Sequence, residues 1–170
     1  MLRLTLAWLH LVALGIGLWS VLTRGQALRR AARELPGTEA LRRAFVADAH
    51  WGVAALLWLT TGLWRYLGST EKTTSYYNSN HIFLTKMALF VTVVALEIWP
   101  MVTLIRWRTA LGRARVPAGT TAAGATAAVA PRFDPGRARR MATISYIEGA
   151  IVIVMVFTAV AMARGYGSPG

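Results

Sequence analysis

Hydrophobic residues in this chain are gathered into four long, nearly uncharged stretches that are separated by polar, arginine-rich segments. A helix needs about 20 consecutive apolar residues to cross the ~30 Å hydrocarbon core of a bilayer. Stretches of that length cover residues 4–23, 45–67, 82–105 and 142–163. The pattern therefore predicts an all-α protein, an integral membrane four-helix bundle in which each stretch is one transmembrane helix.

The four stretches follow one another closely enough to form a single transmembrane domain over residues 1–170. The first stretch is long for the apolar part of a signal peptide and is followed by basic residues, so we interpret it as a retained helix. Residues 116–131 are almost entirely alanine, glycine and threonine, a composition that buries too little to fold. We expect this segment to be a flexible cytoplasmic linker.

Arginine is concentrated in two of the three segments that connect the stretches. Residues 24–43 hold six arginines and residues 106–140 hold eight, whereas residues 68–81 contribute only Lys72 as a basic side chain. Short loops rich in lysine and arginine stay in the cytoplasm. The predicted orientation therefore places both chain ends outside, N-out and C-out, with Arg24 at the start of the first cytoplasmic loop.

The composition agrees with a membrane protein and narrows the site chemistry. Of the 170 residues, 55% are hydrophobic and 15% are charged, which is unusual for a soluble domain. The net charge of +12 lies beside the spans, where it meets anionic headgroups, so we expect a lipid bilayer and no nucleic acid as partner. The absence of cysteine excludes disulfides and thiolate ligands.

Several ionisable side chains fall inside the predicted spans, and a rise of ~1.5 Å per residue sorts them by depth into two sets. The outer, cationic set consists of His10, Arg65 and Lys86, with His81 at the boundary. The inner, mostly acidic set consists of Asp48, His50, Glu97 and Glu148. Charges in hydrocarbon are costly, so these residues are functional candidates. The structural alternative is that Arg65 and Lys86 extend to the lipid headgroups, while Asp48 forms ion pairs with loop arginines.

The spacing along each helix indicates which of these side chains point into the bundle. Residues three, four or seven apart share a helix face. Asp48 shares a face with the small residues Gly52, Ala55 and Gly62, so we expect that face to contact another helix. His50, two residues from Asp48, should point elsewhere.

The inner acids pose a charge problem if they converge. Like charges in a poorly solvated space oppose ionisation, so at most one or two carboxyl groups can stay charged. The cations of similar depth are His50, Arg106 and Arg140. We expect Glu97, the deepest acid, to be neutral, or else to be reached by an arginine or water from the cytoplasmic side. If it is neutral, Glu97→Gln should leave folding nearly unchanged.

A haem site is the main cofactor to consider. Two histidine ligands must meet at one iron, but His10 and His50 lie on opposite sides of the midplane and differ in depth by about 13 Å. If haem b binds, His10 is the metal ligand, with Lys86 as the second ligand or as a propionate contact. Otherwise we expect no cofactor.

Four short segments carry a resemblance over nearly the whole chain except the linker: "AWLHL", "VADAHWGVAALLWLTTGLWR", "NHIFLTKMALF" and "MARGYG". In these the chain resembles a bacterial family of four-helix membrane proteins catalogued as a domain of unknown function. This likeness implies the bacterial inner (cytoplasmic) membrane and leaves the activity open. More distantly, His10 followed by Lys86 is similar to haem-containing membrane protoporphyrinogen oxidases and to copper-resistance D membrane proteins, which implies these two residues as a cofactor-binding pair.

Three hypotheses about function follow. The first is a haem-binding or redox-associated membrane protein built around His10 and Lys86. The second is a non-catalytic accessory subunit of a larger membrane complex, because the helices have wide apolar faces and the chain holds seven tryptophans. The third is a small proton-coupled transporter in which Lys86 and the inner acids lie on a path across the bilayer. Whether the chain is an enzyme is left open.

Overall fold

The computed structural model describes residues 1–34, 38–68, 72–114 and 133–167. Within these ranges every regular element is a helix, as the sequence predicted for the fold class. The elements are α1 (Leu2–Ala31), α2 (Thr38–Leu67), α3 (Thr74–Ser79), α4 (His81–Ala114) and α5 (Pro135–Ala163). The linker predicted at residues 116–131 lies outside the described residues.

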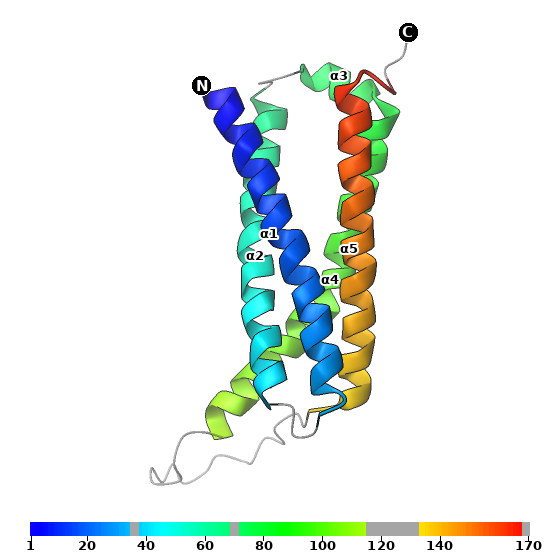
Figure 1. The fold of residues 1–170 in the computed structure, drawn as a ribbon. Coiled ribbons are helices and arrows are strands. Elements are labelled where there is room, and N and C mark those ends of the chain that lie inside the picture. Colours follow the sequence, from blue (N-terminus) through cyan, green and yellow to red (C-terminus); the bar gives the residue numbers. More distant parts are fainter. Residues whose placement is uncertain (35–37, 69–71, 115–132, 168–170) are drawn as a thin grey trace, which may run out of the picture.

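The four long helices run side by side, and α1 contacts both α2 and α5 while α4 contacts α5 (Figure 1). The start of α1, the end of α5 and the short α3 lie at one end of the molecule, which we call the terminal end. The end of α1 and the start of α2 lie at the opposite end, which we call the loop end. Successive long helices therefore alternate in direction.

Three of the long helices in the described chain are long and apolar enough to cross a membrane, namely α1, α4 and α5. The prediction of apolar spanning helices is thus confirmed in part. Helix α2 does not reach the same mean hydropathy, because it carries Asp48, His50 and several tryptophan and threonine side chains among its apolar residues. The helices also extend beyond the predicted spans, since α1 has 30 residues where the sequence suggested a span of 20.

The ends of α3, α4 and α5 are fixed by side chains that take up free backbone N–H groups. Asp134 accepts hydrogen bonds from the backbone of Gly136 and Arg137, and Pro135 occupies the first turn of α5. The buried Asn80 accepts from the first backbone amides of α4 and donates to the carbonyl of Tyr166. Asn80 therefore ties the C-terminal segment to the α3–α4 junction.

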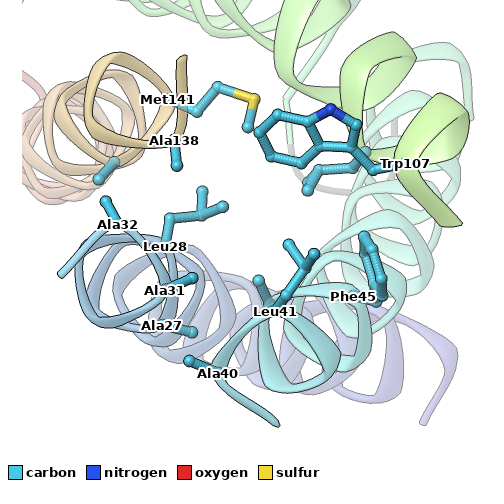
Figure 2. Packing of buried hydrophobic residues seen from close by; sticks show 13 residues of the cluster. Ala27, Leu28, Ala31, Ala32, Ala40, Leu41, Phe45, Trp107, Ala138 and Met141 are labelled. Carbon is cyan, nitrogen blue, oxygen red and sulfur yellow. The ribbon is translucent and has the colours of Figure 1, made fainter. Parts of the chain in front are cut away.

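Helix α4 contains Pro100, and Figure 1 shows the helix changing direction in its second half. Proline cannot donate to the carbonyl four residues earlier and crowds it, so it bends a helix. The bend carries the last turns of α4 toward α2. There Leu104 and Trp107 join an apolar cluster with residues of the other long helices, among them Leu41, Phe45 and Met141 (Figure 2).

Glycines permit close contact between α1 and α2, although the contacting face differs in part from the predicted one. A Cβ at Gly17 would lie 3.2 Å from the ring of Trp51, and one at Gly62 would lie 3.1 Å from the ring of His10. Gly52, by contrast, is exposed and has nothing within 4 Å of its Cβ position. The prediction for Gly52 is therefore wrong, because the buried stripe of α2 runs through Trp51 and Ala54 instead.

A buried arginine centre as the candidate functional site

Arg24 is the centre of the most extensive polar cluster in the described chain. The sequence suggested that it begins a cytoplasmic loop, but Arg24 lies within α1, which continues to Ala31, and its side chain is 0% exposed. The alternative that Asp48 pairs with an arginine of that segment is the one the structure shows. A charge buried to this extent is tolerated only when it is paired and hydrogen-bonded.

The guanidinium of Arg24 meets that requirement through side chains from α2, α4 and α5. Nη1 donates to Asp48 Oδ1 at 2.8 Å and to Glu97 Oε1 at 2.6 Å. Nη2 donates to Glu97 Oε2 at 2.7 Å and to Glu148 Oε2 at 2.6 Å, and Nε donates to Ser145 Oγ at 3.0 Å. The contact with Glu97 is bidentate, which is the strongest form of this pairing. Each long helix thus contributes at least one residue to one centre.

The centre holds more acid than base. Three carboxyl groups surround one guanidinium, and the further cation that acts on Asp48 is Arg108, which lies nearer the loop end on α4. Glu97 and Glu148 bond to the same nitrogen and lie within hydrogen-bonding reach of each other. Oε1 of the fully buried Glu148 has no hydrogen-bond partner in the described part of the chain. The acids therefore have capacity for additional protons.

The surroundings of the centre differ on its two sides. Toward the loop end lies the apolar cluster of Figure 2, which separates the centre from that surface. Toward the terminal end lies an apolar cavity of about 180 Å³, with walls from all four long helices. Glu97 stands in the wall of this cavity and its side chain is 16% exposed. Glu97 is therefore the point where the charged centre meets the cavity.

The outer cationic residues form a second polar group around Trp58. The His10 ring stacks on Trp58 with centroids 5.3 Å apart, and Lys86 Nζ lies 6.0 Å from the Trp58 ring. Lys86 and Arg65 are both close enough to act electrostatically on His10. The structure thus brings together His10, Lys86 and Arg65, whereas His81 and His50 are exposed.

The hydrogen bonds of Thr61 favour one tautomer of His10. The Thr61 hydroxyl donates to the carbonyl of Leu57 at 2.7 Å, so it accepts at 2.9 Å from an Nδ1–H of His10. Nε2 then keeps its lone pair and is the ring nitrogen that can bind a metal or a proton. Trp58 covers one face of the ring and stands between His10 and the cavity.

Comparison with known proteins agrees with the helical, apolar character of the chain. The profile of a family described as "Predicted membrane protein (DUF2214)" matches residues 2–167. The chain belongs to the DUF2214 family. Among curated proteins and among solved structures nothing matches this DUF2214 protein.

The described residues of the DUF2214 protein do not assemble a metal site of three or more His, Asp or Glu ligands. The cavity beside the Arg24 centre does not reach His10. Haem binding to His10 and Lys86 therefore stays a prediction of the sequence.

Two residues of the DUF2214 centre, Arg24 and Ser145, were not among the predicted site residues. A hydropathy pattern ends a span at the first strong charge, and Arg24 was that charge. The helical spacing contained a signal for Arg24, because Arg24 lies seven residues after Gly17 and fourteen after His10, on the buried face of α1.

Proposed function

We propose that this DUF2214 protein is a small proton-coupled membrane protein and that the Arg24 centre is its proton-binding site. The observation that carries the proposal is the excess of acid over base around Arg24. With every group ionised, the three carboxylates and one guanidinium would leave two uncompensated negative charges in a poorly solvated space. Such a charge is costly in a medium of low dielectric constant. One or two protons on the carboxyl groups remove it.

The proton belongs first on Glu148. Glu97 has both oxygens engaged by Arg24 and behaves as the ionised partner. Glu148 uses a single oxygen, is fully buried, and lies beside Glu97, where only a protonated acid can donate a hydrogen bond between two carboxyl groups. Loss of that proton would change the hydrogen bonds of the Arg24 centre. Because Glu97 belongs to both the centre and the cavity wall, the wall would change with it.

Infrared difference spectroscopy on purified protein tests the proton site. We expect a neutral carboxylic acid band at pH 7 that Glu148→Gln removes. The matched control is Glu39→Gln, which alters an acid that is also paired with arginines but lies on the surface. A spectrum that is unchanged by Glu148→Gln would mean that Glu148 holds no proton.

Proteoliposomes test whether the proton site is coupled to transport. Vesicles that contain the wild-type protein should relax an imposed pH gradient faster than vesicles that contain Glu148→Gln at the same protein content. Equal rates would mean that the Arg24 centre takes no part in proton transport. The Glu39→Gln protein serves again as the control for reconstitution.

We further propose that all four long helices cross the bilayer, with the terminal end outside and the loop end in the cytoplasm of a bacterial inner membrane. Helix α2 has 30 residues, as α1 does, and packs along it, so the two helices span the same thickness of the bilayer. The loop end carries the exposed arginines of α1, α2 and α5, as the positive-inside rule requires.

Haem or metal binding at His10 is the second candidate, and the Thr61 hydrogen bond favours it. Metal-bound histidines commonly donate their other N–H to an oxygen, as Nδ1 does here. Binding at Nε2 would require Trp58 to move. Visible absorption of protein expressed with haem supply tests this candidate, since His10→Ala should abolish a Soret band. The accessory-subunit alternative stays a prediction, because a bilayer covers the exposed apolar faces as well as a partner would.

A further inference from the structure

Asp48 differs from the other two acids of the Arg24 centre because one of its oxygens is accessible. Its Oδ1 accepts from Arg24, and its side chain is 19% exposed. Its Oδ2 accepts no hydrogen bond from the residues that the structure describes, and this oxygen is not buried. Glu97, by contrast, has both oxygens engaged by Arg24, and Glu148 is fully buried. Asp48 is therefore the acid of the centre that can exchange a proton with its surroundings.

The exposed part of Asp48 lies outside the apolar cavity, on the side of Arg108. Glu97 lines the cavity, whereas Asp48 does not. Arg108 acts electrostatically on Asp48, and its Nη2 donates at 3.4 Å to the carbonyl oxygen of Phe45, one helical turn before Asp48. Arg108 is itself exposed and lies nearer the loop end on α4. Asp48 thus opens beside an exposed cation, and long cationic side chains of this kind extend toward the headgroups and water.

The surface of α2 next to Asp48 is uncovered in the described part of the chain. Gly52 lies one helical turn after Asp48, is exposed, and has nothing within 4 Å of its Cβ position. Helical side chains lean toward the N-terminus of their helix, so a side chain at position 52 would lie over the turn that holds Asp48. Glycine at this position accordingly leaves the carboxyl group of Asp48 accessible.

We propose that Asp48 is the residue through which protons enter and leave the Arg24 centre, from the loop-end side of the contact between α2 and α4. Nη1 of Arg24 bonds to Asp48 and Glu97, and Nη2 bonds to Glu97 and Glu148, so the three acids form a row. A proton from water adds to Oδ2 of Asp48, Asp48 gives a proton to Glu97, and Glu97 gives one to Glu148. In each transfer one O–H bond breaks and one forms, while the guanidinium keeps its protons. This inference rests on the proposed function, because it supplies the route to the proton on Glu148.

Hydrogen–deuterium exchange of the neutral acid tests the route, because the carboxylic acid band of Glu148 moves to lower frequency when a deuteron replaces the proton. The full-length protein in mild detergent is transferred to deuterated water, and infrared spectroscopy follows the rate of that change. We expect Asp48→Asn to slow the exchange about a hundredfold, because an amide keeps the shape of the side chain but does not relay a proton. Ala55→Phe narrows the cavity beside Glu97 and should leave the rate unchanged.

A second pair of variants keeps every charged group of the centre in place. Gly52→Leu covers Asp48, and the matched control Gly15→Leu adds the same side chain at an exposed glycine of α1 that also has nothing within 4 Å of its Cβ position. We expect slower exchange in Gly52→Leu and the wild-type rate in Gly15→Leu, and this pair decides the question if Asp48→Asn does not fold.

Two failures can be told apart. An unchanged rate in Gly52→Leu, or slower exchange in Ala55→Phe, would overturn the entry route, while the band itself would still support a proton on Glu148. Absence of the band from the wild-type protein would instead overturn the proton site, and the entry route with it.

Discussion

At the scale of single residues, Arg24 is the side chain that connects α1 to α2, α4 and α5 by hydrogen bonds. A guanidinium offers five donors in a planar fork, and Arg24 uses them toward three carboxyl groups and a serine hydroxyl. Lysine cannot reproduce a bidentate contact together with lateral contacts, because its ammonium is a compact point charge. Arginine at this position is therefore a geometric requirement as well as an electrostatic one.

Removal of Arg24 should be strongly destabilising. Arg24→Gln leaves the buried Glu148 and the partly buried Asp48 and Glu97 without their cation, and breaking a buried pair in this way costs about 3–5 kcal/mol. Unfolding of the purified protein in detergent, followed by circular dichroism, measures the change. The stability of Arg24→Lys should lie between that of Arg24→Gln and that of the wild type. The control Arg42→Gln removes an exposed ion pair with Glu39 and should leave the midpoint of the unfolding transition unchanged.

The two glutamates of the centre should respond differently to the same substitution. Glu97→Gln removes the ionised partner of a bidentate pair and should cost about 3 kcal/mol, whereas Glu148→Gln mimics a neutral acid and should cost less than about 1 kcal/mol. The sequence analysis expected Glu97→Gln to be tolerated only if Glu97 is neutral, and the structure instead shows its alternative, in which an arginine reaches Glu97. The same unfolding measurement compares them, and an equal loss in both variants would show that the two acids share one protonation state.

At the scale of secondary-structure elements, Pro100 determines how α4 relates to α2. It lies three residues after Glu97, so the bend falls just beyond the arginine centre. The turns before the bend pack along α5, and the turns after it bring Leu104 and Trp107 into the apolar cluster at the loop end. Before the bend α4 meets α2 through aromatic side chains, such as Phe90 against Trp58, and the cavity lies beside these rings, whereas after the bend Arg108 donates to the backbone of Phe45 on α2.

Straightening α4 should therefore move its last turns away from α2. Pro100→Ala restores the donor to the Leu96 carbonyl and removes the steric cause of the bend. The chain has no cysteine, so spin labels can be attached at Arg42 and Thr109, two exposed positions, after each is changed to cysteine. Their separation should increase in Pro100→Ala. Labels at Arg30 and Arg139, on α1 and α5, should keep their separation. If neither separation changes in Pro100→Ala, helix packing and not the proline causes the bend.

At the scale of the whole molecule, the arginine centre is a junction between four antiparallel helices. Each helix is largely apolar on the outside, so the bilayer by itself gives little preference for one helix arrangement over another. A charge on α1 that is satisfied only by acids on α2, α4 and α5 supplies that preference. The centre thus selects one bundle, and we infer that proton binding acts on the whole arrangement.

The proposed topology predicts a labelling pattern in intact cells. Ser79→Cys at the end of α3 should react with a membrane-impermeant maleimide from outside, because the proposed topology places the terminal end outside. Glu34→Cys, before α2, and Thr109→Cys, near the end of α4, should react only after lysis. Reaction at both Glu34→Cys and Ser79→Cys in intact cells would mean that α2 does not cross the membrane. Protection of Ser79→Cys with reaction at Thr109→Cys would invert the orientation.

The sequence by itself determined the helical class, the apolar character of three long helices and the family. These properties depend on sums over consecutive residues, since the cost of placing a segment in hydrocarbon is nearly additive along the helix. The sequence also singled out His10, Lys86, Asp48, Glu97 and Glu148 by their position in apolar stretches, and the structure places the three acids around Arg24. Their partners could not be obtained in this way.

Only the tertiary structure decided that Arg24 lies inside the bundle and that Glu97 is its bidentate partner. A charged residue ends a predicted span because an isolated charge in hydrocarbon is costly, and that rule fails when three acids from other helices remove the cost. The cavity likewise depends on the direction that α4 takes after Pro100, which sets the distance between two helices that are not neighbours in the chain. Pairing across helices is a non-local property, and no window along the sequence contains it.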